Sequence, residues 1–202
     1  MEEPSPLVDD GDEVADRLGV RLTSPERVVF EGQGITKSQL VAYYEDVAEA
    51  MLPHIVNRPL SLVRCPQGPT KHCFFQKHNT GSFPEQMKSK IIAENDGEKA
   101  DYFYITDLAG LVAGTQMNVL EWHVWGSRFP KIEKTDRMVF DIDPDEGLGF
   151  THVIEAAAYI RDRLQDLGLV SYPMVSGGKG IHVIVPLTPD KEWPAIKAFC
   201  RA

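Results

Sequence analysis

The chain has 202 residues, of which 43% are hydrophobic and 25% charged, and its formal net charge is −9. This length and composition support a buried core, which excludes a wholly disordered, collagen-like or coiled-coil protein. No apolar run approaches the roughly 20 residues that span a bilayer, so no membrane partner is expected. The acidic charge argues at first sight against a nucleic-acid partner.

The negative charge is concentrated at the N-terminus. The first 20 residues carry seven acidic side chains and one basic one, whereas residues 21–90 carry nine basic and six acidic ones. Residues 1–18 are predicted to form a mobile acidic leader, which lacks the basic start and apolar stretch of a secretory signal. Residues 19–202 are predicted to form the folded domain, and its positive stretch keeps a nucleic-acid partner open.

The first half of this domain mixes helices with short strands. Thr36 is a suitable N-cap for a helix over residues 37–52, whose apolar side chains recur at helical spacing and which ends at Pro53. Strands are expected at 60–65, 73–77 and 102–105, and a loop at 80–100.

Residues 107–125 predict a short helix and then a strand. Asp107 caps the helix expected over 107–117. In the strand expected over 118–125, side chains alternate between an apolar face of Leu120, Trp122 and Val124 and a second face of Glu121, His123 and Trp125.

The last third predicts strands at 137–143, 170–175 and 181–186. An amphipathic helix is expected over 151–167, with an apolar face of Val153, Ile154, Ala157, Ile160, Leu164 and Leu167. A second helix begins at Pro194, and the chain is expected to stop inside it. Strands and helices in this order indicate an α+β fold with mixed or antiparallel sheets flanked by helices.

Cysteine usage favours a reducing cytoplasm. The three cysteines are Cys65, Cys73 and Cys200, and no C-x-x-C occurs, so neither a disulfide framework nor a zinc finger is expected. His72, Cys73 and His78 could be imagined as metal ligands, but adjacent strand residues point to opposite faces.

Asp141-Ile142-Asp143 is the first candidate site. The two carboxylates share one face at the end of an apolar strand. Converging carboxylates repel unless a cation neutralises them, and a pair of hard divalent ions is the recurrent solution in polymerases and nucleases. The alternative is that Asp143 and Asp145 only cap the following loop.

The second candidate site is Ser176-Gly177-Gly178-Lys179-Gly180-Ile181-His182, which connects two apolar strands. Glycines allow positive φ and expose backbone N–H groups to an anion, and Ser176, Lys179 and His182 add donors. One strand and helix after the paired aspartates, the segment reads as a cradle for a triphosphate. The alternative is an ordinary hairpin turn.

Aromatic and basic residues form the remaining candidates. Arg64 and the run Phe74-Phe75-Gln76-Lys77-His78 fit base stacking with phosphate contacts. Because a strand alternates, Phe74 and Phe75 cannot face the same groove unless it bends, and one of them is expected in the core. His123 lies on the polar strand face and is either a sugar or phosphate contact or a structural histidine.

Together these motifs resemble the polymerase domain of bacterial DNA ligase D, a member of the archaeo-eukaryotic primase superfamily that serves non-homologous end joining. The resemblance is collinear from about Gly19 to the last residue. It is carried by Arg58-Pro59-Leu60-Ser61-Leu62-Val63-Arg64, Phe74-Phe75-Gln76-Lys77-His78, Glu121-Trp122-His123, Asp141-Ile142-Asp143-Pro144 and the segment from Ser176 to His182.

The resemblance implies a primase-type core that adds nucleotides, preferably ribonucleotides, at DNA breaks and gaps. Asp141 and Asp143 match the metal-binding acids, with Mn²⁺ favoured and Mg²⁺ acceptable. Other matched positions are triphosphate contacts (Ser176, Gly177, Gly178, Lys179, His182), the contact near the sugar 2′-hydroxyl (His123) and the base-stacking pair (Phe74, Phe75). Arg27 and Lys37 match basic positions that hold the 5′-phosphate of the downstream strand, and Arg64 and Lys77 are further candidates.

The family also uses a third metal-ligand aspartate on a later strand, and this chain ends before it. We therefore expect a domain incomplete at its C-terminus, with binding retained and catalysis weak or absent. The implied partners are nucleoside triphosphates, double-stranded DNA ends and gaps with a 5′-phosphate, fused or separate ligase and nuclease domains, and a Ku-type end-binding protein. The implied location is cytoplasmic and nucleoid-associated.

Two rival interpretations remain. The chain could only bind 5′-phosphorylated DNA ends, through Arg27, Lys37 and the aromatic pair. Haloacid-dehalogenase-type phosphatases also place D-x-D at a strand end, but here Pro144 follows the motif and only 59 residues come after Asp143.

Overall fold

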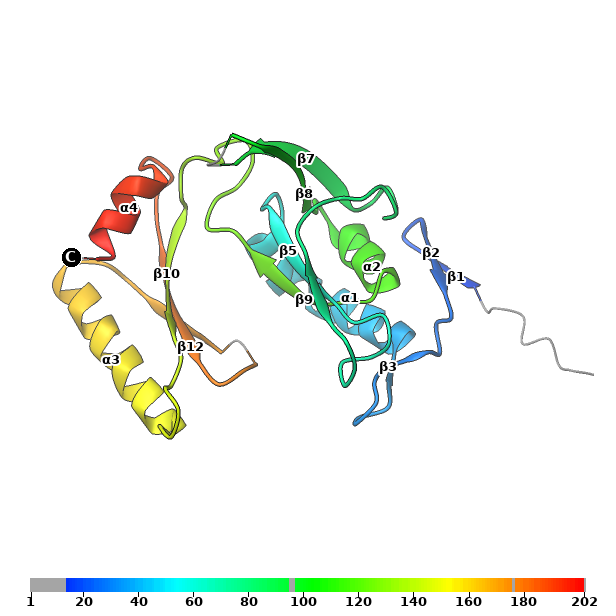
Figure 1. Ribbon diagram of the computed structural model, residues 1–202, viewed down its shortest axis with the longest axis horizontal. Coiled ribbons are helices and arrows are strands. Elements are labelled where there is room, and N and C mark those ends of the chain that lie inside the picture. Colours follow the sequence, from blue (N-terminus) through cyan, green and yellow to red (C-terminus); the bar gives the residue numbers. More distant parts are fainter. Residues whose placement is uncertain (1–13, 95–96, 176, 202) are drawn as a thin grey trace, which may run out of the picture. The chain divides into compact units, whose positions relative to one another are not determined.

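The computed structural model describes residues 14–94, 97–175 and 177–201. The chain divides into two compact units, Met1–Val124 and Trp125–Ala202. In the described residues, four helices accompany antiparallel sheets, as the sequence predicts for an α+β fold (Figure 1). Most of the expected leader, residues 1–13, lies outside the described residues, and so does Ser176.

Helix α1 (Lys37–Ile55) begins where the sequence predicts. The Thr36 hydroxyl accepts a hydrogen bond from the Gln39 backbone N–H, and the Gln39 side chain accepts one from the Thr36 N–H. This capping box satisfies two N–H groups that the first helical turn leaves without partners. The helix runs past its predicted end and contains Pro53 in its last turn.

One five-stranded antiparallel sheet organises the first unit, with the order β6-β5-β8-β7 and β9 paired along β5. Its strands are β5 (Leu60–Arg64), β6 (Phe74–Gln76), β7 (Lys88–Ala93), β8 (Lys99–Tyr104) and β9 (Val119–Val124). Helix α2 (Leu108–Gln116) starts after Asp107, whose side chain accepts from the Gly110 N–H. Apolar residues of α1, α2 and the sheet form one buried core, which includes Val41, Leu62, Phe103 and Leu111.

Two predictions for this unit are wrong in part. Val14–Arg17, the end of the expected leader, is strand β1 and pairs with β2 (Val20–Thr23). Lys88–Ala93, inside the expected loop, is strand β7, in which only Ile92 is buried. A strand at the edge of a sheet keeps most side chains in solvent, so its sequence is as polar as that of a loop. A second small ribbon pairs β3 (Val28–Phe30) with β4 (Ile35–Thr36).

A disulfide joins Cys65 to Cys73, contrary to the prediction of reduced cysteines. The two cysteines follow β5 and precede β6, and the pairing of Arg64 with Phe74 places them side by side. Residue counts alone do not reveal this register, which is why the sequence did not predict the bond. Cys200 is free and exposed.

Opening this disulfide is expected to destabilise the chain. The bond closes a loop over a sequence separation of 8 residues, for which chain entropy gives about 2–3 kcal/mol. Urea unfolding of Cys73→Ser should therefore show a lower free energy of unfolding than the oxidised parent protein. Cys200→Ser is the matched control and should unfold like the parent, whereas equal stability of Cys73→Ser and parent would contradict a role for the bond.

The second unit is built on a three-stranded antiparallel sheet of order β10-β12-β11, with helix α3 packed against it (Figure 1). Its elements are β10 (Arg137–Ile142), α3 (Phe150–Asp166), β11 (Tyr172–Val175), β12 (Ile181–Pro186) and α4 (Trp193–Phe199). Alternate residues of β10 and β12 and one stripe of α3 form the core, which includes Met138, Val153, Val183 and Val185.

Two details of this unit differ from the prediction. Ile154 and Leu167, assigned to the apolar face of α3, are half-exposed or more, because the sheet covers only the stripe centred on Val153, Ala157 and Leu164. Helix α4 ends at Phe199, with Cys200 as its C-cap, rather than running to the end of the chain.

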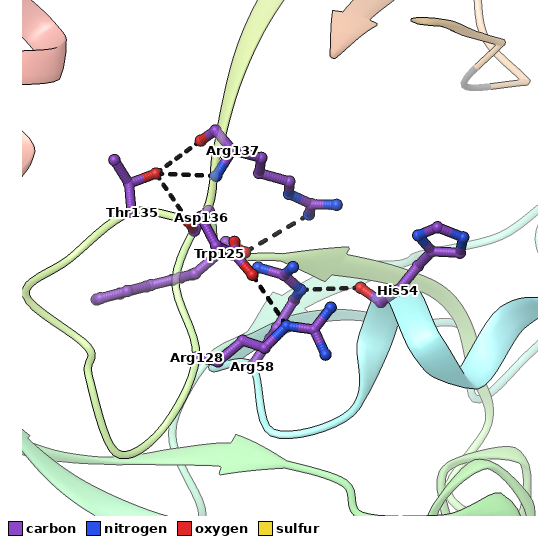
Figure 2. Close-up of polar contacts among 8 residues, drawn as sticks. His54, Arg58, Trp125, Arg128, Thr135, Asp136 and Arg137 are labelled. Atoms are coloured by element: carbon purple, nitrogen blue, oxygen red, sulfur yellow. Dashed lines mark hydrogen bonds and ion pairs between the residues drawn. The ribbon is translucent and has the colours of Figure 1, made fainter. Parts of the chain in front are cut away.

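Polar contacts fix the chain where it enters β10 (Figure 2). The Thr135 Oγ1 atom lies 2.8 Å from the Gly126 carbonyl oxygen and 2.6 Å from that of Arg137. Arg128 Nε donates to Asp136 Oδ2 at 2.9 Å. In the first unit, Arg58 Nε donates to the His54 carbonyl at 2.9 Å and closes the end of α1. The contacts of Thr135 and Arg128 fix the segment just before β10, the strand that carries Asp141.

No helix among the described residues combines the length and apolar character required to cross a membrane.

Candidate functional site

The carboxylate pair lies at the end of β10. Met138, Phe140 and Ile142 belong to the core and the residues packed on it, so strand alternation puts Asp141 and Asp143 on the opposite face. Asp141 pairs in register with His182 of β12, and its Oδ1 lies 3.2 Å from His182 Nε2. The Asp141 side chain is 66% exposed. The structure therefore brings together two predicted site residues that are 41 positions apart.

The glycine-rich turn contacts the second carboxylate. A Cβ at Gly180 would lie 2.3 Å from Asp143 Oδ1 and 2.5 Å from the Ile142 carbonyl oxygen. Only glycine therefore lets the turn approach the end of β10 this closely. Gly177 has a φ of +86°, and Lys179 lines a hollow with Gly178 and the loop that follows Asp143.

The donors at this end of the sheet fit a divalent cation. Carboxylate oxygens are the ligands that Mg²⁺ and Mn²⁺ prefer. Asp141 and Asp143 place two carboxylates on one face, and the space that Gly180 leaves open is filled by one of the Asp143 oxygens. Within residues 14–94, 97–175 and 177–201, no group of three or more His, Cys, Asp or Glu side chains could hold a metal ion. Cys73 is in the disulfide, so the imagined site with His72 and His78 has no thiolate.

The aromatic pair belongs to the first unit and is split between two environments. Phe75 pairs with Val63, is 66% exposed and meets the His123 ring edge-on at 5.4 Å between centroids. Phe74 pairs with Arg64 and is 36% exposed. The prediction that strand alternation separates the two rings is confirmed, whereas the expectation that one of them lies in the buried core is wrong.

His123 lies on the polar face of β9, as predicted. Its Nε2 lies 2.8 Å from Glu121 Oε2, and its side chain is 50% exposed. Trp122, on the other face, donates its indole N–H to the Tyr44 hydroxyl at 3.0 Å. Trp122 therefore packs against the core of the unit, whereas His123 lies on the exposed face of the same strand.

The two predicted phosphate-binding cations, Arg27 and Lys37, differ in exposure. Lys37 is buried, and its Nζ donates to the Thr23 carbonyl at 2.8 Å and lies 3.4 Å from Gln116 Oε1. Burial lowers the pKa of Lys37, and the positive charge of Arg27 lowers it further. Arg27 is exposed and donates to the Pro66 carbonyl. No sequence pattern indicates Gln116 as a partner, since this residue is far from both cations along the chain.

The depressed pKa of Lys37 should appear in the pH dependence of stability. The folded protein releases the Lys37 proton at lower pH than the unfolded chain, so stability should rise as pH increases from the folded-state pKa to the usual value of 10.5. Urea unfolding of the parent protein and Lys37→Met, compared at about pH 8 and pH 10, should show the parent gaining relative to the variant. A constant difference would contradict the buried ammonium.

Arg64 and Lys77 differ in how far their side chains are held within the protein. Arg64 Nε donates to the Met117 carbonyl at 2.8 Å and Nη1 to Gln76 Oε1 at 2.7 Å, and burial lowers its pKa. Lys77 is exposed directly after β6. Of these two, Lys77 is therefore the more accessible to a phosphate.

Comparison with known proteins decides the family. The family model described as the LigD primase-polymerase domain matches residues 36–202. The chain belongs to the LigD primase-polymerase family. This confirms the family resemblance, and nothing in the match supports the phosphatase alternative.

Individual LigD proteins agree with this assignment. The multifunctional non-homologous end joining protein LigD of Mycolicibacterium smegmatis is 38% identical over 170 residues, which are 83% of this chain and 22% of the relative. That of Pseudomonas aeruginosa is 32% identical over 91% of this chain and 22% of the relative. The solved polymerase domain of Mycobacterium tuberculosis ligase D in complex with DNA has a TM-score of 0.76 at 36% identity, covering 86% of this chain and 62% of that one. The chain thus spans about a fifth of the length of the Mycolicibacterium smegmatis and Pseudomonas aeruginosa proteins.

Proposed function

We propose that this chain acts as a DNA-directed nucleotidyltransferase, adding ribonucleotides or deoxyribonucleotides at DNA breaks and gaps during non-homologous end joining. The observation that carries the proposal is the contact between Asp143 and the glycine-rich turn beside the Asp141–His182 pair, in a member of the LigD primase-polymerase family. Paired carboxylates next to backbone donors suit a metal-bound triphosphate.

In the second unit, Asp141 and Asp143 would hold Mn²⁺ or Mg²⁺. When bound, such ions neutralise the triphosphate and lower the pKa of the attacking hydroxyl. The N–H groups of Gly177 and Gly178 would orient phosphate oxygens, and Lys179 and His182 would add positive charge or donors. The protein's own contribution is then position and charge rather than covalent chemistry. The hydroxyl of Ser176, the first residue of this segment, is proposed as a further hydrogen-bond donor to the phosphates.

In the first unit, the side chains suit nucleic acid. Phe75 offers an exposed ring for stacking on a base, with Phe74 beside it. His123 would contact the 2′-hydroxyl of the incoming sugar, and Arg27 with Lys37 would hold the 5′-phosphate of the downstream strand. Lys77 would add a phosphate contact.

The proposed partners follow from the same chemistry. They are double-stranded DNA ends and gaps with a 5′-phosphate, supported by the similar solved polymerase domain, which is in complex with DNA. Ligase and nuclease domains, fused or separate, and a Ku-type end-binding protein are proposed because the similar LigD proteins are named for non-homologous end joining. A cytoplasmic, nucleoid-associated location belongs to the same proposal.

A second candidate function is binding of 5′-phosphorylated DNA ends without catalysis. It is favoured by the closeness of Arg27 and Lys37 in the first unit, where the Lys37 backbone N–H donates to the Arg27 carbonyl at 2.9 Å. This function requires no residue of the second unit. Primer extension on a gapped duplex, with Mn²⁺ and ribonucleotides, separates the two functions. Metal-dependent extension supports the transferase, whereas tight binding of the 5′-phosphorylated duplex without extension supports the binder. Failure to bind this duplex at all would overturn both.

Removing Arg27 should weaken recognition of the 5′-phosphate selectively. A charge-assisted contact to phosphate is worth about 1.5–3 kcal/mol, so Arg27→Ala should lose about tenfold or more in affinity for the 5′-phosphorylated duplex. Fluorescence anisotropy with 5′-phosphate and 5′-hydroxyl duplexes measures the difference. The control is Arg161→Ala, which removes an exposed arginine of α3 that pairs with Asp162. An equal loss for both duplexes in Arg27→Ala would count against the assigned role.

A further inference from the structure

The end of the β5–β6 hairpin carries a row of flat side chains. The Arg64 guanidinium lies over the Phe74 ring at 5.5 Å and over the Phe83 ring at 5.0 Å. The His72 ring stacks on Phe74 at 6.2 Å between centroids with 27° between planes. Phe83 packs in turn on buried Phe103 at 4.4 Å. The row therefore runs from an exposed loop to the core of the first unit.

Arg64 is held on several sides within this row. Besides its two ring contacts, it donates to the Met117 carbonyl and the Gln76 side chain. A guanidinium has five N–H donors in a fixed plane, so two such bonds and two rings fix its orientation. The Cys65–Cys73 disulfide lies beside the Arg64–Phe74 pair in the register and closes the hairpin at the same level. This setting suits a support for Phe74 better than a mobile contact to phosphate.

Phe75 has a different setting on the same strand. Phe75 is 66% exposed, against 36% for Phe74, and its ring lies 5.4 Å from that of His123 between centroids, with 61° between the planes. A nucleobase needs an accessible ring face, and Phe75 has more of its surface accessible. The two adjacent phenylalanines therefore have unequal opportunities to stack on a base.

We propose that Arg64 is a positioning residue: it fixes Phe74 between itself and His72, and through the strand it presents Phe75 as the ring that stacks on a nucleobase. The inference deepens the proposed function and rests on it, because it assumes that the aromatic pair meets DNA or a nucleotide. It assigns Arg64 no direct phosphate contact.

The test uses gapped 5′-phosphorylated duplexes that carry 2-aminopurine at the templating base or its neighbours, whose fluorescence falls on stacking. Phe75→Ala should abolish the quenching and weaken binding about tenfold. Arg64→Ala and Arg64→Lys should both lose most of the quenching, because a lysine ammonium cannot replace a planar guanidinium between rings. The salt dependence of binding should stay unchanged in both, whereas Arg27→Ala should reduce its slope by about one.

The outcomes separate the alternatives. If Arg64→Lys quenches like the parent and Arg64→Ala reduces the salt slope, then Arg64 is a phosphate ligand and the proposal is overturned. Full quenching in Arg64→Ala overturns it as well. If Phe75→Ala quenches normally, the stacking role in the proposed function fails, whatever Arg64 does. If urea unfolding shows that Arg64→Ala does not fold, Arg64→Lys decides the question.

Discussion

Replacing either carboxylate by its amide, as Asp141→Asn or Asp143→Asn, is expected to lower the rate of nucleotide addition by about 10³-fold. A divalent ion stabilises transition-state charge by several kcal/mol, and about 4 kcal/mol corresponds to this factor. Asparagine keeps the size of the side chain but removes the charge that balances the cation. Because Asp141 is largely exposed and lies in no core cluster, folding should be unaffected by its replacement. Rates of extension with saturating Mn²⁺ and ribonucleotide measure the loss.

The control for this experiment is Asp162→Asn, which removes an exposed carboxylate of α3 that pairs with Arg161. It should extend primers like the parent protein. Binding of Mn²⁺, followed by electron paramagnetic resonance, gives a second reading that does not depend on turnover. Retained Mn²⁺ affinity in both Asn variants would remove the metal site from β10. If the parent binds Mn²⁺ and DNA without extending primers, the end-binding function stands and the transferase does not.

The parts of the fold that sequence predicts are those with strong local signals. The N-caps Thr36 and Asp107 start α1 and α2 as expected, because capping depends on residues within one turn. The apolar strands β10 and β12 are also predicted, since the face they bury imposes period two. Edge strand β7 was missed because its few buried side chains leave no such period.

In the candidate site too, some residues are indicated by local sequence and others only by the fold. Asp141 and Asp143 are prominent in the sequence because both carboxylates lie within three residues at the end of one apolar strand. The partners that hold other site residues come from distant segments, as Gln116 does for Lys37 at a separation of 79 residues. Strand register and helix packing create these contacts, and neither is written in the local sequence. The exposure difference between Phe74 and Phe75 has the same origin.

Gly180→Ala is expected to lower nucleotide addition by about 10²-fold through displacement of Asp143. The new Cβ would lie 2.3 Å from Asp143 Oδ1 and 2.5 Å from the Ile142 carbonyl oxygen, both far inside van der Waals contact. The carboxylate can rotate, but the carbonyl belongs to the end of β10 and cannot, so the turn itself must move. A shift of about 1 Å between groups that act together costs about this factor. Overpacking should also lower the free energy of unfolding by about 1–3 kcal/mol.

The matched control is Gly32→Ala, because nothing lies within 4 Å of a Cβ at that position. It should leave addition and unfolding close to those of the parent. The double variant Asp143→Asn with Gly180→Ala tests the coupling: if the alanine acts through Asp143, its effect on addition should largely vanish once that carboxylate is gone. Additive losses would mean that Gly180 acts on the glycine-rich turn independently of Asp143. Addition within about twofold of the parent in Gly180→Ala alone would show that the close approach of turn and strand is not needed for the reaction.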